Sequence, residues 1–232
     1  MDQYIYLFIS VFLCVPWIVF FCSRPDLRRK ILKTSIIGGL AGLAAEFWYF
    51  RDYWRPPSSV GLATVSPEDF LFGFFITGLA VSVYDVVFRK SISNGEQCRK
   101  RHFAFLFLTG IGALFLLSNW LGFYSIFVSS VAFIIFSIIM ASIRKDLWIP
   151  LLGSGILTLL LIIPGYTVLF NLISPTYWDL YGLLSGTPYG ATVLGNIPLT
   201  ELLWYFSWGC MAGIAYDFAS GKKKTTALKT GK

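Results

Sequence analysis

Acidic residues recur at matching places in the two halves of an otherwise apolar chain. Asp69 opens an apolar segment that closes on Asp85, and Glu201 opens a second one that closes on Asp217. Both pairs are separated by the same distance along the chain, 132 residues (201 − 69 and 217 − 85). Because a carboxylate is costly in lipid, an acid that recurs in each half of a membrane protein is a candidate for function.

Further acids and one amide fall near Asp69 and Glu201. Glu68 and Asp69 stand together in a first helical turn, as does Glu201, where the helix dipole favours a carboxylate. Glu46 lies near the end of the preceding apolar segment, and Asn171 holds the equivalent place in the second half. We expect these five side chains at one membrane depth, toward the outer face. Plain N-terminal capping is the alternative explanation of the acids that open helices.

Asp85 and Asp217 belong to the other end of the same segments. At about 1.5 Å per residue, 16 residues place each of them about 24 Å from its partner acid. Basic residues follow them closely, at Arg89, Lys90 and Lys222. We therefore interpret Asp85 and Asp217 as members of structural ion pairs.

Several kinds of site are excluded by the residues that the chain lacks. His102 is the only histidine, so a His-cluster iron site, zinc hydrolysis and a Ser-His-Asp triad are excluded within the chain. The four cysteines show no CxxC spacing, and 153–155 lacks the third glycine of a dinucleotide fingerprint. We expect no cofactor and no metal. Two kinds of function remain: carboxyl acid–base chemistry on an apolar substrate, and transport.

The composition indicates an all-α integral membrane protein. Hydrophobic residues make up 56% of the chain and charged residues 13%, and the mean hydropathy is +0.69. A bilayer-spanning helix needs about 20 mostly apolar residues. The sequence predicts seven such helices, at about 4–22, 31–50, 67–88, 103–122, 124–142, 148–172 and 198–219.

The positions of the basic residues predict the orientation of these helices. All but two of the 19 Lys and Arg residues fall at helix ends that would share one side; the exceptions are Arg51 and Arg55. By the positive-inside rule the N-terminus is outside and the C-terminus is cytoplasmic. The basic residues are scattered over loop ends, so we expect membrane lipid and not nucleic acid as a partner.

The repeat predicts the domain organisation. Residues 1–90 and 123–220 are expected to be two three-helix repeats, with 91–122 as a linker helix. One linker restores the direction of the chain, so the repeats are parallel about an axis along the membrane normal. Residues 221–232 form a basic, polar tail that we expect to be cytoplasmic and disordered.

Short motifs accompany the acids in both halves. In the first half Glu46 is followed by Trp54, Pro56, Gly61 and the segment Glu-Asp-Phe-Leu-Phe at 68–72. The second half carries a related series, made of Pro164, Asn171, Trp178, Gly195 and the segment Ile-Pro-Leu-Thr-Glu at 197–201. At these residues the chain resembles the integral-membrane lycopene cyclase domain family, whose members carry two homologous three-helix units.

The resemblance implies a cofactor-free isoprenoid cyclase. In the family's mechanism a carboxylic acid protonates a terminal alkene, an internal double bond attacks the cation and closes a ring, and proton loss completes an isomerisation without redox. Glu68 matches the family's leading acid and is expected to be the donor. Asp69, Glu201 and Glu46 would orient it or accept the final proton. Contacts to the substrate are expected from Asn171, Trp54, Trp178 and Thr200, and other isoprenoid-pathway enzymes are possible partners.

Two alternatives to the cyclase stay open. A small seven-helix carrier would share the parallel three-helix repeats joined by one helix. A non-catalytic carotenoid- or isoprenoid-binding relative is the other alternative. Thr200 favours it, because Thr200 stands where the family has the first acid of its second pair.

Overall fold

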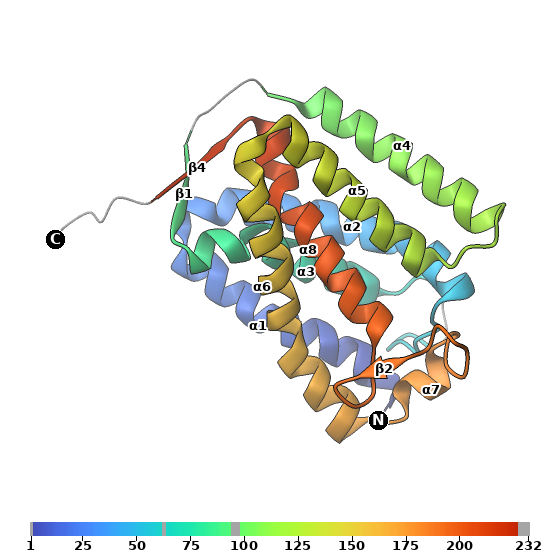
Figure 1. Ribbon diagram of the computed structural model, residues 1–232. Coiled ribbons are helices and arrows are strands. Elements are labelled where there is room, and N and C mark those ends of the chain that lie inside the picture. The colour runs from blue at the N-terminus through green and yellow to red at the C-terminus, as the bar shows by residue number, and fades with distance from the viewer. Residues whose placement is uncertain (1, 62–63, 94–97, 227–232) are drawn as a thin grey trace.

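A computed structural model describes residues 2–61, 64–93 and 98–226 and is mostly helical (Figure 1). Each segment that was expected to span the membrane is helical. The helices are α1 (Ile5–Ser23), α2 (Arg28–Asp52), α3 (Pro67–Val87), α4 (Lys100–Asn119), α5 (Ser125–Ile143), α6 (Trp148–Thr167), α7 (Tyr177–Tyr181) and α8 (Leu199–Ser220). A π-helical segment, Val168–Ile173, continues α6, and three short 3-10 turns lie at Asp2–Tyr4, Pro25–Leu27 and Lys145–Leu147.

Two pairs of short antiparallel strands complete the fold. Strand β1 (Lys90–Ser93) pairs with β4 (Lys223–Thr226), and β2 (Thr192–Val193) pairs with β3 (Ile197–Pro198). The expectation that the whole tail is disordered is therefore wrong for 223–226, which form a strand because β1 offers them a backbone edge. Residues 227–232 lie outside the described part of the chain.

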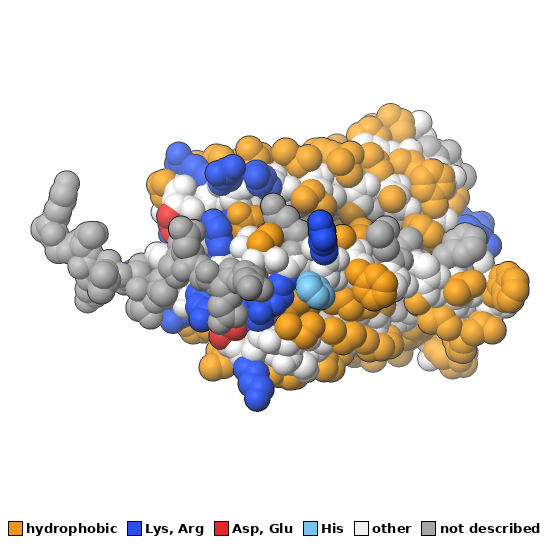
Figure 2. Space-filling view, turned by 90° about the horizontal axis from the view of Figure 1, so that it is seen from above, with side chains coloured by type: hydrophobic (Ala, Val, Ile, Leu, Met, Phe, Trp, Pro, Cys, Tyr) orange, Lys and Arg blue, Asp and Glu red, His pale blue; other side chains and the backbone are white. Residues whose placement is uncertain are grey.

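Within the described residues, five helical segments are long and apolar enough to cross a membrane. Apolar side chains cover the long sides of the molecule, while Lys and Arg gather chiefly at the end that carries β1 and β4 (Figure 2). These features indicate a multi-pass membrane protein. The five segments are Asp2–Ser23, Pro25–Asp52, Pro67–Val87, Ser125–Ile143 and Lys145–Ile173.

Helices α3 and α8 lie side by side in the middle of the bundle (Figure 1). The most extensive contacts of α3 are with α2 and α1, and those of α8 are with α6 and α5. Helix α4 lies at the edge, where it contacts α5 and α8. The first three and the last three long helices therefore pack in the same way around a shared central pair.

Equivalent arginines hold the ends of the two central helices. The Arg24 guanidinium pairs with Asp26 and donates hydrogen bonds to the backbone oxygens of Asp85 (2.6 Å) and Lys90 (2.5 Å). The same set of contacts recurs in the second half, at Arg144, Asp146, Asp217 and Lys222. The arginines are 120 residues apart (144 − 24), whereas the aspartates are 132 apart (217 − 85). The 12 additional residues fall in the longer connection between α6 and α8.

The middle of the bundle is packed closely in both halves. A side chain on Gly38 of α2 would lie 2.1 Å from the Thr77 hydroxyl of α3, so only glycine fits there. The equivalent contact in the second half has the residues exchanged, with Thr158 of α6 against Gly209 of α8. Small residues let helix backbones approach closely in membranes. At this depth the packing leaves the helix pairs in direct contact.

A cluster of four buried charges joins the central helices to α2 and β4. The Lys30 ammonium lies 2.8 Å from Asp85 and 3.2 Å from Asp217, and the Lys224 ammonium makes contacts of the same lengths with both carboxylates. Each of the four side chains is at most 6% exposed. We call these four residues the ion quartet. Its two lysines balance its two aspartates, so the buried cluster carries no net charge.

The structural ion pairs expected at Asp85 and Asp217 are confirmed, but the expected partners are wrong. Arg89, Lys90 and Lys222 follow the aspartates in the chain, yet the carboxylates contact Lys30 and Lys224. Side chains of a helix point back toward its N-terminus. An aspartate near a helix end therefore meets neighbouring elements rather than the residues that come next.

Removal of one lysine from the ion quartet should destabilise the fold. Lys30→Met leaves two buried aspartates with one cation, and breaking a buried pair in this way costs about 3–5 kcal/mol. The double variant Lys30→Met with Asp217→Asn restores neutrality and should regain part of that loss. Thermal unfolding in detergent measures both, with Lys33→Met at an exposed position of α2 as the control. A double variant no more stable than Lys30→Met alone would contradict this account.

Candidate functional site

The carboxyls singled out by the sequence lie at the end of the bundle opposite the ion quartet. Asp69 and Glu201 occupy the first turns of α3 and α8. Aromatic rings connect these turns, because Phe72 of α3 contacts both Trp204 and Tyr205 of α8. The two helices run in the same direction, so their first turns meet at one end and Asp85 and Asp217 meet at the other.

Asp69 is buried and receives three hydrogen bonds. Ser66 closes the start of α3 by donating from its backbone N–H (2.6 Å) and its hydroxyl (3.1 Å) to one carboxylate oxygen. The Tyr6 hydroxyl of α1 donates to the other oxygen at 2.7 Å. Asp69 is therefore a capping residue, but its second oxygen faces the interior and not water. Three donors favour the ionised form of the carboxyl.

Glu201 receives one hydrogen bond on each oxygen. Tyr53, which follows α2, donates at 2.7 Å, and Tyr166 of α6 donates at 2.9 Å. Tyr53 also lies 3.1 Å from the Thr200 hydroxyl, and Tyr166 lies 2.5 Å from the Tyr205 hydroxyl. Burial, and after it the charge of Glu201, raises the pKa of Tyr53 well above its ordinary value. Tyr53 thus remains a donor to Glu201 over a wide pH range.

Glu46 has the fewest partners of these carboxyls. Its side chain is 4% exposed, and the Trp54 side chain lies close enough to interact with it. Its carboxyl oxygen Oε1 has no hydrogen-bond partner among the described residues. Glu46 lies close enough to Asp69 and Glu201 for the three charges to interact. The structure therefore brings together Glu46, Asp69 and Glu201.

Glu68 is buried but faces a different group of atoms. Its Oε1 accepts a hydrogen bond from the Ser59 backbone N–H at 2.7 Å, and the Ser59 and Ser66 hydroxyls are close by. Its Oε2 has no hydrogen bond within the described part of the chain. Successive helical residues point in different directions, so Glu68 faces the connection between α2 and α3 while Asp69 faces the bundle.

Asn171 does not join the carboxyls. Its amide donates to the Leu194 backbone oxygen at 2.7 Å and accepts from the Asn196 backbone N–H at 2.8 Å. It thereby fastens the long connection before α8. The offset of 120 residues that relates α2 to α6 makes Tyr166 the counterpart of Glu46 (46 + 120), and the π-helical turn begins only after that position.

Trp54 and Trp178, expected as substrate contacts, stack on each other at the same end of the bundle. Their ring centroids are 5.6 Å apart and their planes differ by 22°. Tyr6 packs edge-on against Trp54 at 4.8 Å. The two tryptophans come from equivalent connections, after α2 and in α7, so their stack joins the two halves above the carboxyls.

Sequence reasoning missed the tyrosines that surround the carboxyls. Four of them hydrogen-bond within the site, and a fifth, Tyr177, is fully buried there. One signal could have found two of them, because Tyr53-Trp54 and Tyr177-Trp178 are matching dipeptides in the connections that follow α2 and α6. The four hydrogen-bonded tyrosines are Tyr6, Tyr53, Tyr166 and Tyr205.

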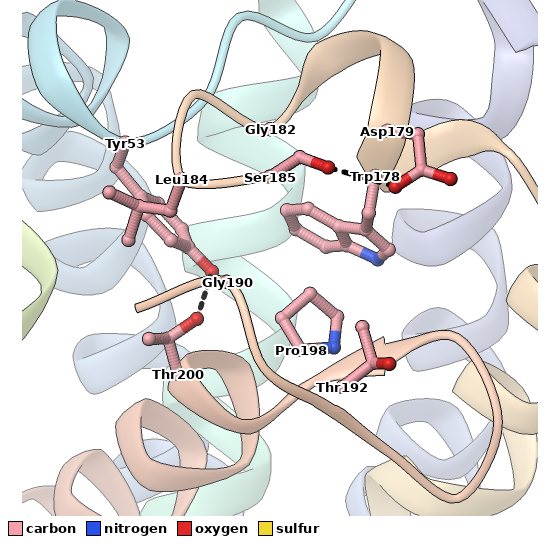
Figure 3. Close-up of a pocket in the computed structure, with 10 residues that line it drawn as sticks. All are labelled: Tyr53, Trp178, Asp179, Gly182, Leu184, Ser185, Gly190, Thr192, Pro198 and Thr200. Carbon is pink, nitrogen blue, oxygen red and sulfur yellow. Dashed lines mark hydrogen bonds between the residues drawn. The ribbon is translucent and has the colours of Figure 1, made fainter. Parts of the chain in front are cut away.

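A small cavity adjoins the site on the side of the long connection (Figure 3). Tyr53 and Thr200, joined by their hydrogen bond, line one side of it, and the Trp178 indole lies across from them. Its volume is about 30 Å³, room for a group the size of water. A larger cavity of about 160 Å³ lies near Arg51 and Asp52, and its lining includes none of the carboxyls of the site.

The site holds carboxyls without cations. Among the described residues no ion pair involves Glu46, Glu68, Asp69 or Glu201. The same part of the chain holds no group of three His, Cys, Asp or Glu side chains arranged for a metal ion. Closely spaced buried carboxyls, supplied with hydroxyl donors, are suited to holding and transferring a proton.

Comparison of the chain with protein-family models, with curated proteins and with solved structures gave no match.

Removal of the Tyr53 hydroxyl should loosen the end of the bundle that holds the carboxyls. Tyr53→Phe keeps the ring but deprives Glu201 and Thr200 of their shared partner. The expected loss is about 1–3 kcal/mol, the contribution of a buried hydrogen bond to a carboxyl. Unfolding in detergent measures it, and Tyr189→Phe at a half-exposed tyrosine is the matched control. Equal stabilities of the two variants would contradict a supporting role for the Tyr53 hydroxyl.

Proposed function

We propose that this chain is a membrane-embedded isoprenoid cyclase of the kind that its resemblance to the lycopene cyclase domain family implies. The observation that carries the proposal is the group of three buried carboxyls, Glu46, Asp69 and Glu201, enclosed by aromatic rings and free of described cations. Protonation of an alkene requires an acid that keeps its proton until the substrate arrives. Carboxyls that repel one another in an apolar enclosure satisfy that requirement.

The aromatic enclosure suits the cation that follows protonation. Tyr6, Trp54, Phe72, Trp178 and Tyr205 pack around the carboxyls with centroid separations of 4.8–6.2 Å. Aromatic faces attract a cation without forming a bond to it. An internal alkene can then capture the cation and close the ring. Because the adjoining cavity is of water size, the end of a linear isoprenoid reaches the carboxyls only when the 182–198 connection moves outward.

The membrane arrangement that we propose has seven spans. Helices α4 and α8, with 20 and 22 residues, have the length to join the five most apolar segments. The arginine contacts and the glycine–threonine contacts that recur in both halves support two parallel three-helix repeats. The basic end with β1 and β4 would face the cytoplasm, and the carboxyl site the outer side.

A seven-helix carrier and a non-catalytic isoprenoid-binding protein are the alternative functions. A carrier needs a polar cavity at mid-depth that opens to each side in turn. The close contacts of Gly38 with Thr77 and of Thr158 with Gly209 argue against one at that depth. A binding protein would keep the aromatic enclosure without turnover. Conversion of a substrate is therefore the decisive measurement.

The unmodified chain should convert lycopene, or a shorter linear isoprenoid with a terminal trisubstituted alkene, into a cyclic isomer of identical mass. In D₂O each ring should carry one deuterium, because the attacking proton comes from an exchangeable carboxyl. Mass spectrometry of pigment from membranes that contain the protein measures both. Membranes without the protein are the control, and bound but unchanged isoprenoid would favour the binding function.

Cysteine labelling should place the two ends of the bundle on opposite sides of the membrane. With Cys98 as the only cysteine, a membrane-impermeant maleimide should react only after permeabilisation, because exposed Cys98 lies at the end of α8. A variant with Thr176→Cys as its only cysteine, at the exposed start of α7, should react in intact cells. Labelling of Cys98 in intact cells would contradict the proposed orientation.

A further inference from the structure

The two halves of the site differ in how fully their carboxyls are bonded. In the second half both oxygens of Glu201 accept tyrosine hydroxyls, and the Tyr166 donor is itself bonded to Tyr205. That half leaves no described polar atom unpartnered at Glu201 or its donors. The hydrogen bonds of Glu201 and its donors are therefore complete, which suits a structural role.

Elsewhere in the site, α2 and α7 carry three buried polar atoms without partners in the described part of the chain. They are Glu46 Oε1, the Tyr177 hydroxyl and the Trp178 indole N–H, on side chains that are 4%, 0% and 5% exposed. Buried polar groups in native proteins are normally hydrogen-bonded, so a group of unpartnered ones requires an explanation. The three side chains come from α2 and α7, at the end of the bundle that holds the carboxyls.

Contacts and charges place the Tyr177 hydroxyl beside the carboxyls. Burial, and after it the neighbouring Tyr181, raises the pKa of Tyr177 well above its ordinary value. The charges of Glu201 and Glu46 act in the same direction. Tyr177 also packs against Trp178 at 5.8 Å, so its ring belongs to the aromatic enclosure.

The pseudo-symmetry of the fold indicates which carboxyl these groups would be expected to contact. Tyr53 and Tyr166 donate to Glu201, and the residues at their equivalent positions in the opposite halves are Tyr177 (53 + 124) and Glu46 (46 + 120 = 166). If the repeat were exact, these two residues would hydrogen-bond Asp69, which is equivalent to Glu201. Asp69 is instead bonded by Tyr6 and Ser66. The groups that would donate to Asp69 are thus left with unpartnered polar atoms.

We infer that Glu46 is the proton donor of the reaction, with Asp69 as its charged neighbour and Tyr177 as the hydroxyl that orients the exchanging proton. This inference rests on the proposed function and narrows it to one half of the site. Of the carboxyls in the cluster, Glu46 is the one with an oxygen free to carry an acidic hydrogen toward a substrate. Asp69 accepts three hydrogen bonds, which favour the negative charge of the pair at that carboxyl.

The reaction balances with this pair alone. The O–H bond of Glu46 breaks, and its proton forms a C–H bond with the π electrons of the terminal alkene, which leaves a tertiary carbocation. The π electrons of an internal alkene form the C–C bond that closes the ring. A neighbouring C–H bond then breaks, its electrons form the new double bond, and the proton returns to the Glu46–Asp69 pair. No oxidant or reductant is needed.

Glu68, the donor expected from the sequence, has the opposite surroundings. The Ser59 backbone N–H donates to it, the Ser59 and Ser66 hydroxyls lie near it, and it occupies the first turn of α3. Backbone N–H groups at a helix start favour a carboxylate over a carboxylic acid. Glu68 would stabilise the connection between α2 and α3, where its loss affects the site indirectly.

The test compares three variants of the full chain in membranes supplied with lycopene. Glu46→Gln keeps the size of the side chain but removes the acid and should reduce conversion about 10²–10⁴-fold, the contribution of general acid catalysis. Glu68→Gln should lose less. Asp52→Asn is the matched control on the same helix, because Asp52 bonds to Ser125 outside the site, and its conversion should equal that of the unmodified chain.

Infrared spectroscopy supplies a readout that does not depend on turnover. The resting protein should show the C=O stretch of a protonated carboxyl, and that band should disappear in Glu46→Gln but persist in Glu68→Gln. If the unmodified chain converts lycopene and Glu46→Gln does so equally well, or the band is unaffected by Glu46→Gln, the inference is wrong and the proposed function stands. A greater loss of conversion in Glu68→Gln would assign the donor role to Glu68. If the unmodified chain converts no isoprenoid, the proposed function fails, and a band at Glu46 then reports a proton without a catalytic role.

Discussion

Each buried charge of this bundle must find its partner inside the protein, because lipid offers none. At the β1–β4 end the ion quartet meets this constraint, since Lys30 and Lys224 each bridge Asp85 and Asp217. One aspartate comes from α3 and the other from α8, so the shared lysines fix the rotation and depth of the two helices relative to each other. Their first turns, 16 residues earlier in each helix (85 − 69 and 217 − 201), are thereby brought side by side. The geometry of the carboxyl site depends on this alignment.

The opposite end meets the same constraint with hydroxyls. Tyr6, Tyr53 and Tyr166 donate to Asp69 and Glu201, where a lysine would have neutralised them. The chemical consequence differs, because an ammonium beside a carboxylate holds it in the charged form, whereas a phenol stabilises it and still allows it to take up a proton. The ion quartet is therefore suited to holding the helices together, and the carboxyl end is suited to exchanging protons. Residues of similar type serve opposite purposes at the two ends of α3 and α8.

The sequence predicted the helices but not the residues that contact the buried acids. Apolar runs of about 20 residues predicted every long helix, because lipid demands that length. The 132-residue offset of Asp69 and Glu201 predicted two equivalent central helices. What the offset could not supply was the identity of residues that approach from elsewhere in the chain. Lys30 follows a loop and Lys224 lies in a polar tail, and neither position indicates that its ammonium is buried between two helices. The tyrosines of the site could not be predicted for the same reason. The chain has twelve tyrosines among many other aromatic residues, and each of them could serve only in packing.

Duplication of a structural unit does not make a site symmetric. The contacts that hold helices together, such as those of Arg24 and Arg144, are nearly identical in the two halves, because the same packing problem is solved twice. At the carboxyl end, two pairs of equivalent positions carry different residues. Glu46 corresponds to Tyr166, and Ser66 corresponds to Pro198 (66 + 132). Tyr166 donates a hydrogen bond to Glu201, whereas Glu46 at the equivalent position has an oxygen, Oε1, without a partner among the described residues. Transfer of a proton from one particular carboxyl requires two carboxyls with different surroundings. In two identical halves both carboxyls would bind the proton equally well, and neither would be the preferred donor.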